Sequence, residues 1–417
     1  MNAFENLVAL VVEDSAVQRA QAMAVVKEMG FGTVLEAENG LDALRILEQA
    51  EQRQVFLLVT DIDMPEMDGI ELIGKLAEAY PVDNLIVTSA RDPRLLETVE
   101  RIASDHSSIN LLGTIPKPLT TPALAKLLNL AKRTPPPGQA APSVYGMMTL
   151  DEIEAAIDDG HVVPYFQPKV DVKTGAIRGV EALARIALPD QGLVPPQRFI
   201  TTLEGSPLMQ RFTLAMVGKS LERFKTWTSV MPHLKISLNL SADDLAEKTF
   251  LDQLMARVQS HGVDPSLINW EVTETMVMKS QSLANLARLG LKGYGLSMDD
   301  YGIGYSSNMI LAQSPFTELK IDRIFVHGAS TRLNRRAVLE NAIDMARTLQ
   351  ITTVAEGVED VADWSILYLL GCDQLQGYLV SRPMPGEDFL PWVKSSRIFL
   401  RETAHAAAAG FEPSSPN

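Results

Sequence analysis

The sequence predicts an α/β protein with two domains: a doubly wound parallel sheet followed by a barrel of alternating strands and helices. Three observations predict it. Short apolar runs alternate with helical periods in the first 130 or so residues. A Pro-rich stretch, TPPPGQAAPS at residues 134–143, separates this part from the rest. The part that follows, residues 148–397, has the usual length of such a barrel.

The composition excludes several classes of protein. The 417 residues include 37 Lys and Arg against 52 Asp and Glu, and the resulting charge of −15 opposes binding to nucleic acid. A single cysteine, Cys372, cannot form an intramolecular disulfide. No stretch reaches the ~18 apolar residues that span a bilayer, and the first residues lack the features of a signal peptide. We therefore expect a cytoplasmic protein without nucleic acid or membrane partners.

The first domain is expected over residues 5–132, with a linker at 133–147. Its strands are indicated by apolar runs, which are typical of parallel strands buried on both faces. In chain order these runs lie at 7–12, 34–35, 55–59, 85–88 and 111–115. After the first run, Val17, Ala20 and Ala24 fall on one face of a predicted helix, and another helix is expected over 41–47. A sheet of this kind binds ligands at the carboxyl ends of its strands.

Polar residues follow four of these runs. Glu13 and Asp14 follow the first, Asp61 the third, Thr88 the fourth and Lys117 the fifth. Three carboxylates in one crevice repel each other unless a divalent cation such as Mg²⁺ joins them. Asp61 could then accept a phosphoryl group, which Lys117 would neutralise and Thr88 would detect. The alternative is that these are ordinary surface residues at strand ends.

The same residues lie in motifs that resemble the receiver domain of response regulators. These motifs are Glu13-Asp14, DIDMPEMDG from Asp61, VTSA from Val87 and Lys117-Pro118. The resemblance implies phosphorylation of Asp61 by a sensor histidine kinase or a phosphotransfer protein. It also implies one Mg²⁺ on Asp14, Asp61 and the backbone at Asp63. The switch residues would be Glu13, Thr88 and Lys117, whereas Thr114 occupies a position that is often Tyr or Phe in receivers.

In the second domain, strand-like runs repeatedly end at or near an acid, an amide or a lysine. These residues are Glu181, Asn239, Glu271, Asp299, Asp300, Lys320 and Glu356. In a barrel they would meet at one mouth, and carboxylates without histidine suit Mg²⁺ or Mn²⁺ rather than zinc. Two ions sharing Asp299 could activate a water for attack on a phosphodiester, with Lys320 supplying positive charge. The alternative for each acid is a helix cap or a solvated loop residue.

Eight ordered motifs over residues 148–397 resemble the EAL-domain cyclic di-GMP phosphodiesterases. They are YFQPKVD from Tyr165, EALAR from Glu181, ISLNLS from Ile236, EVTET from Glu271, MDDYGIGYSS from Met298, LKID from Leu319, AEGVE from Ala355 and QGYLVSRPMP from Gln376. The resemblance implies a TIM-like (β/α)8 barrel whose first strand is antiparallel. It also implies hydrolysis of cyclic di-GMP to linear pGpG by two metal ions, Mg²⁺ or Mn²⁺.

The resemblance assigns a role to each matching residue. One metal would be held by Glu181, Asn239, Glu271 and Asp299, and the other by Asp299, Asp300 and Glu356. Lys320 and Glu356 would position or deprotonate the attacking water. The dinucleotide would contact Gln167, Leu183, Arg185 and Gln376. Glu274 and Glu359 would support the loop after Asp300, in which Ile303 replaces a residue that is often Thr.

Two hypotheses about function remain. In the first, the chain is a phosphodiesterase regulated by phosphorylation and is a homo-oligomer, a dimer or larger. In the second, it is a catalytically silent receptor or scaffold for cyclic di-GMP. The complete set of ligands favours the enzyme, although the receiver could itself supply an output through a dimer face. Residues 401–417 carry no long apolar period and end in Ser and Pro, so we expect a disordered tail.

Overall fold

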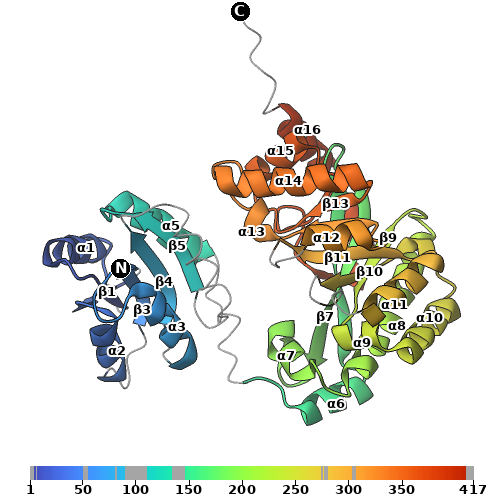
Figure 1. Ribbon diagram of the computed structural model, residues 1–417, viewed down its shortest axis with the longest axis horizontal. Helices are drawn as coiled ribbons and strands as arrows, with labels where there is room; N and C mark the ends of the chain where they lie inside the picture. The colour runs from blue at the N-terminus through green and yellow to red at the C-terminus, as the bar shows by residue number, and fades with distance from the viewer. Residues whose placement is uncertain are drawn as a thin grey trace, which may run out of the picture. The chain divides into compact units, whose positions relative to one another are not determined.

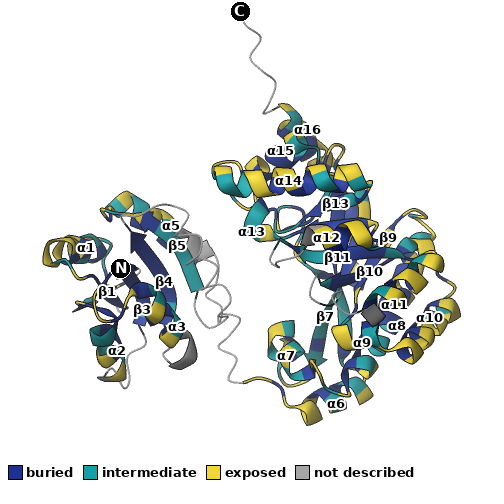
Figure 2. Cartoon of the chain, in the orientation of Figure 1, coloured by how far each residue is buried: buried dark blue, intermediate teal, exposed yellow. Residues whose placement is uncertain are grey.

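The computed structural model describes residues 4–5, 7–49, 55–79, 82–89, 110–133, 146–273, 276, 280–302 and 307–409. The chain forms two compact units, residues 1–144 and 145–417 (Figure 1). Each has its own buried apolar core, to which strands and helices both contribute, while the helices turn exposed faces outward (Figure 2). None of the described helices is both long and apolar enough to cross a membrane.

The first unit is a five-stranded parallel sheet, which confirms the predicted doubly wound fold. Its strands are β1 (Val8–Val12), β2 (Thr33–Ala37), β3 (Val55–Asp61), β4 (Val82–Ser89) and β5 (Asn110–Pro116). The described helices are α1 (Ala16–Glu28), α2 (Gly40–Gln49), α3 (Gly69–Ala79) and α5 (Thr121–Arg133). The strand order is β2-β1-β3-β4-β5, so the chain reverses its winding between β1 and β3. Ligands of such sheets bind in the crevice at this point of reversal.

The predicted helix α1 forms, but the face that Val17, Ala20 and Ala24 share is not its buried face. Val17 is 79% exposed, and Ala20 and Ala24 are exposed too. The buried residues of α1 are instead Arg19, Ala22 and Val26, which also share a helical face. Arg19 is buried because its guanidinium donates to the backbone oxygen of Glu13 at 2.7 Å, and a count of apolar residues could not reveal this.

The second unit is a closed barrel of eight strands, as predicted. They are β6 (Val162–Asp171), β7 (Ile177–Leu188), β9 (Lys235–Asn239), β10 (Ile268–Thr273), β11 (Gly295–Tyr301), β12 (Glu318–Ile321), β13 (Thr352–Ala355) and β14 (Gln374–Leu375). The first strand, β6, is antiparallel to both of its neighbours, β7 and β14, and closes the barrel. The other neighbouring pairs are parallel. Their carboxyl ends therefore meet at one mouth.

Helices surround the barrel and connect most of its strands (Figure 1). They are α6 (Leu150–Asp158), α7 (Ile200–Leu203), α8 (Met209–Thr228), α9 (Ala242–Ala246), α10 (Lys248–His261), α11 (Ser280–Leu291), α12 (Ser307–Gln313), α13 (Arg323–Val326), α14 (Leu333–Leu349), α15 (Val361–Leu370) and α16 (Gly386–Ala409). Short elements are β8 (Gly192–Val194), β15 (Met384–Pro385) and the 3-10 turns η1 (Pro196–Arg198) and η2 (Pro265–Leu267). Local sequence features set the ends of these helices. Thr149 and Glu152 form a capping box before α6, and α15 ends at Gly371, which has a φ of 78°.

The expected disordered tail is wrong for residues 401–409, because α16 continues through them. Leu400, Ala404 and Ala407 are buried in the barrel core, one helical turn apart. Alanine has the highest helix propensity, so this Ala-rich segment extends the helix along α15, which lies beside it (Figure 1). The rest of the predicted tail, 410–417, lies outside the described residues.

Candidate active site

The inward side chains of the barrel gather around Lys320 on β12. Its Nζ lies 2.7 Å from Glu356 Oε1 and 2.9 Å from Asp299 Oδ1. It also lies 2.9 Å from Glu271 Oε2 and 3.5 Å from Glu181 Oε1. Alternate residues of a strand face the same side, so acids from β7, β10, β11 and the end of β13 can meet inside the barrel. The structure thus brings these five predicted residues together.

Asp299 and Asp300 both lie near Glu356, although consecutive residues of a strand normally face opposite sides. Carboxylate oxygens of the three lie within 4.8 Å of one another. The pairing of β11 with β12 is irregular between Met298 and Tyr301, and Asp300 has a φ of 56°. Asp tolerates this left-handed conformation better than most residues. The irregularity allows two adjacent acids to join one cluster, as bulges do next to active sites.

The carboxylates have strongly shifted pKa values. Burial and the charge of Asp299 raise the pKa of Glu356 to about 8. Burial and Glu271 raise the pKa of Glu181 to about 7, while burial and Asp299 raise that of Asp300 to about 6. Burial, together with like charges, thus favours the protonated form of these three acids in spite of the nearby lysine. A cluster of this kind fits divalent cations with a preference for oxygen ligands.

A second buried lysine, Lys169 on β6, lies deeper in the barrel than Lys320, farther from the mouth. Its Nζ lies 2.9 Å from Glu271 Oε1, 2.9 Å from Glu318 Oε1 and 2.7 Å from Ser237 Oγ. Burial alone would raise the pKa of Glu271, but Lys169 and Lys320 outweigh it and lower that pKa to about 2. Glu271 is therefore an anion between two cations.

Lys169 and Glu318 are not among the residues predicted from the sequence. The spacing along the strands could have identified both residues. Lys169 lies two residues after Gln167, and Glu318 lies two residues before Lys320. Residues two apart on a strand face the same side, so both had to point into the barrel.

The predicted substrate residues lie around the same mouth. The amide of Gln376 donates to Glu181 Oε2 at 2.6 Å and to Gln167 Oε1 at 2.9 Å. Arg185 on β7 has its guanidinium 5.7 Å from the ring of Tyr165. Leu183, two residues before Arg185, is partly exposed. The structure thus places Gln167 and Gln376 against the acidic cluster.

Gly377 sets the position of Gln376, since a Cβ there would lie 2.2 Å from the backbone oxygen of Val358. This close approach lets Val358 N donate to Gln376 O at 3.1 Å, which ties together the segments after β13 and β14.

The remaining predicted residues lie at the edge of the cluster or outside the described chain. Asn239, which is exposed, donates to Glu181 Oε1 at 3.4 Å. Glu359 is exposed, and its charge raises the pKa of His327 together with the stronger effect of a hydrogen bond to Asp363. The loop roles predicted for Glu274 and the departure at Ile303 concern residues outside the described ranges.

The first unit has its own acidic site at the carboxyl ends of β1 and β3. Lys117 Nζ lies 2.7 Å from Glu13 Oε2 and 2.7 Å from Asp61 Oδ2. Asp14 is exposed, and its carboxylate lies within 4.8 Å of those of Glu13 and Asp61. Thr88 is buried on the neighbouring strand and donates to the backbone oxygen of residue 60 at 3.2 Å. The Lys117-Pro118 peptide bond is cis. All five predicted residues therefore lie at one edge of the sheet.

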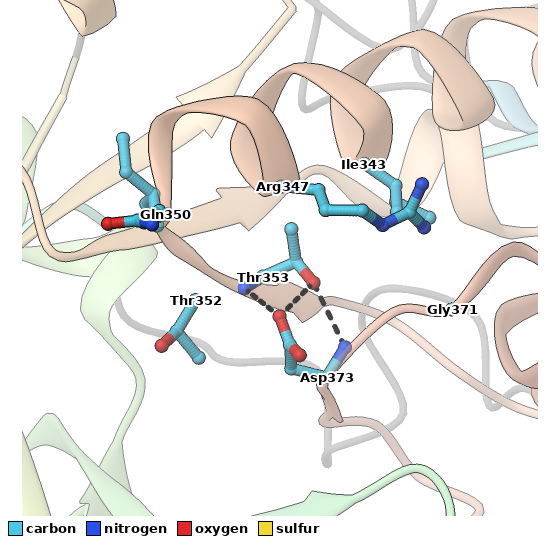
Figure 3. Close-up of a pocket in the computed structure, with 8 residues that line it drawn as sticks. Ile343, Arg347, Gln350, Thr352, Thr353, Gly371 and Asp373 are labelled. Carbon is cyan, nitrogen blue, oxygen red and sulfur yellow. Dashed lines mark hydrogen bonds between the residues drawn. The ribbon is translucent and has the colours of Figure 1, made fainter.

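A cavity of about 260 Å³ lies in the second unit, at the other end of the barrel from the acidic mouth (Figure 3). Thr352 and Thr353 line it and begin β13, whereas Glu356 follows the end of that strand. Asp373 accepts hydrogen bonds at 2.9 Å from both the backbone nitrogen and the hydroxyl of Thr353. These polar groups of Thr353 and Asp373 therefore already bond to one another.

The fold and the two sites define a two-domain protein with a receiver and a barrel carrying an acidic mouth. The family profile of the response regulator receiver domain matches residues 9–129, and that of the EAL domain matches residues 150–383. The chain belongs to the EAL domain family and is a response regulator with an EAL output domain.

Individual relatives agree with this assignment. The cyclic di-GMP phosphodiesterase RocR of Pseudomonas aeruginosa is 32% identical over 392 residues, 93% of this chain and 98% of RocR. The structure of the PaMucR phosphodiesterase with c-di-GMP aligns at 34% identity and a TM-score of 0.55, covering 58% of this chain and 98% of that one. The EAL enzyme Bd1971, with cAMP and cyclic-di-GMP bound, aligns at 29% identity and a TM-score of 0.56 over 58% of this chain and 67% of its own.

Proposed function

We propose that this chain is a cyclic di-GMP phosphodiesterase that yields linear pGpG with two divalent metal ions, and that phosphorylation of Asp61 regulates it. The observation that carries the proposal is the contact of one buried lysine, Lys320, with four carboxylates from four parts of the barrel. An incomplete set of acids would be expected if the barrel only bound the nucleotide.

The donor set fits two metal positions. Glu181, Asn239, Glu271 and Asp299 would hold one ion, and Asp299, Asp300 and Glu356 the other. The raised pKa values of Glu181 and Glu356, about 7 and about 8, support this, because near neutral pH protons partly occupy carboxylates that Mg²⁺ or Mn²⁺ would take. When bound, such ions would make a water more acidic and neutralise phosphate oxygens.

The protein groups would act on the water and the substrate. Lys320 Nζ and Glu356 Oε1, which lie 2.7 Å apart, would position or deprotonate the attacking water, and the positive charge of Lys320 would stabilise negative charge developing on the phosphate oxygens. Gln376 and Gln167 would bind one side of the dinucleotide at the mouth. The Arg185 guanidinium would bind a phosphate or a guanine edge, since its planar donors suit both.

The receiver site supports the regulatory part of the proposal. Lys117 lies 2.7 Å from Asp61, where it would neutralise oxygens of a transferred phosphoryl group. Glu13, Asp14 and Asp61 would hold one Mg²⁺, and Thr88 on the next strand would donate to the new group. The donor of the phosphoryl group would be a sensor histidine kinase or a phosphotransfer protein in the cytoplasm. Dimers or larger homo-oligomers are also part of this proposal.

The test is to separate the products after the purified chain is incubated with cyclic di-GMP and Mg²⁺, and with Ca²⁺ in its place. Linear pGpG should form with Mg²⁺ and fade with Ca²⁺. Asp299→Asn should lower turnover by at least about 100-fold, because even residues that only support metal ligands cost about 10- to 100-fold when changed.

The matched control is Asp252→Asn, which makes the same change at an exposed position on α10 and should leave turnover unchanged. Normal turnover in Asp299→Asn would contradict the two-metal assignment. Substrate that the wild-type chain binds but leaves intact would favour the silent receptor instead.

A further inference from the structure

A layer of charged and polar side chains lies beneath the metal-binding acids of the barrel. We call it the lower layer, and it consists of Lys169, Ser237, Asn269, Ser297 and Glu318, all of them buried. Glu318 receives three hydrogen bonds, from Lys169 and Asn269 at 2.9 Å and from Ser297 at 3.0 Å. Lys169 itself is 2% exposed. Buried charges are costly unless they are paired, so the pairing of Lys169 with Glu318 and Glu271 indicates a specific role.

Glu271 links the lower layer to the acids above it. Its Oε1 accepts from Lys169 and its Oε2 from Lys320, both at 2.9 Å. Two donors on opposite oxygens prevent the carboxylate from rotating. A carboxylate oxygen can accept more than one ligand, so Glu271 keeps free lone pairs for an ion while its orientation is fixed.

The direction of β6 explains why Lys169 can reach this position. Gln167 and Lys169 point into the barrel from the same strand, and Gln167 contacts Gln376 at the mouth. Because β6 runs antiparallel to its neighbours, the residue two positions later lies deeper. The antiparallel strand thus supplies one group to the mouth and one cation beneath it.

We propose that Lys169 is a positioning residue for metal binding, which holds the Glu271 carboxylate in place while Glu318 holds Lys169. This inference rests on the proposed two-metal hydrolysis. Residues that orient metal ligands typically change metal affinity or activity by about 10- to 100-fold when removed. Lys169 would act through Glu271 and would not touch the substrate.

The test uses the full chain with Lys169→Met, the double variant Lys169→Met/Glu318→Gln, and Lys235→Met. Lys235→Met makes the same change at an exposed lysine on β9 and serves as the matched control. Mn²⁺ binding is measured by titration calorimetry, and the Mn²⁺ concentration for half-maximal hydrolysis is measured separately from KM for cyclic di-GMP. The double variant removes the unpaired charge that Lys169→Met leaves on Glu318, so it remains informative if the single variant fails to fold.

We expect Mn²⁺ binding to weaken about 10- to 100-fold in both Lys169 variants, with KM at saturating Mn²⁺ within about twofold of wild type. Wild-type Mn²⁺ affinity in the double variant would overturn the inference, because Lys169 would then only neutralise Glu318. In that case the proposed function would stand. A wild-type chain that neither binds Mn²⁺ nor hydrolyses cyclic di-GMP would overturn the proposed function and this inference with it.

Discussion

The receiver and the barrel both place a lysine among carboxylates at the carboxyl ends of parallel strands, but they do so to different degrees. Lys117 contacts two acids, and its side chain is 12% exposed. Lys320 contacts four acids, and its side chain is 2% exposed. An open sheet has a crevice at its edge, whereas a closed barrel surrounds its inward residues. The lysine and its carboxylates are therefore accessible to solvent in the receiver and enclosed in the barrel.

The difference suits the proposed roles. A phosphoryl group must reach Asp61 and leave it, so an open crevice with one lysine is sufficient. The barrel holds more carboxylates away from water, and a second lysine lies deeper among them. Enclosure, more than the choice of residues, would therefore separate the proposed site of reversible modification from the proposed site of catalysis.

Replacing the lysine of each site should give the largest difference between them in unfolding free energy. Lys320→Met leaves several buried carboxylates without their cation, so we expect a loss of about 3–5 kcal/mol in the unfolding free energy of the metal-free barrel. Lys117→Met should cost about 1–3 kcal/mol in the receiver, because fewer acids lose a partner there. Calorimetry of the full chain, with hydrogen exchange to assign each transition, measures both values. Equal losses in the two units would show that enclosure does not matter.

The raised pKa values of Glu181, Asp300 and Glu356 predict how the metal-free barrel responds to pH. Their folded-state pKa values of about 7, 6 and 8 exceed the ordinary values of 4.5 for Glu and 3.8 for Asp. The folded state keeps protons that the unfolded chain has released, so stability should fall as the pH rises from 4.5 towards 8.

Denaturant unfolding across this pH range checks the prediction, with and without Mg²⁺. Ions should replace the protons, so Mg²⁺ should stabilise the barrel more at pH 8 than at pH 6. An effect of Mg²⁺ that does not depend on pH would contradict the assignment of these acids as ligands.

Asp61→Asn tests whether the receiver site controls hydrolysis in the barrel. The variant should abolish the response of hydrolysis to a phosphodonor such as acetyl phosphate, while Mn²⁺ binding to the barrel stays at the wild-type value. Coupling between sites is typically about 1–3 kcal/mol, so the wild-type response should be about 5- to 150-fold. Glu71→Gln, an exposed acid on α3, is the control. Identical rates of the treated wild type and of Asp61→Asn would show that the receiver does not regulate hydrolysis.

The smallest expected effect concerns the end of α16, which packs against the barrel core. Ala407→Gly in α16 should lower the unfolding free energy by about 1 kcal/mol, because glycine in a helix interior is less favourable than alanine by that amount. Denaturant unfolding of the barrel transition measures it. No change would mean that residues 401–409 contribute little to the barrel, as the sequence had suggested.

Most of the fold could be predicted from local patterns. Apolar runs identified the strands because buried parallel strands have no polar face, and the acids were found because they follow those runs. Which residues of α1 are buried could not be predicted from apolar runs. Arg19 is buried because its guanidinium bonds to the backbone oxygen of Glu13 and to the side chains of Glu36 and Glu38. These partners lie on other elements, and helical periodicity carries no information about them.

The candidate residues Glu181, Asp299 and Lys320 could be identified from local sequence alone, because they lie in recognisable motifs at the ends of apolar runs. The position of Lys169 beneath them, in contrast, depends on the tertiary fold. Its partners Glu271 and Glu318 are 102 and 149 positions away in the chain. Barrel closure alone brings these groups together, and desolvation of the closed interior makes their pairing obligatory.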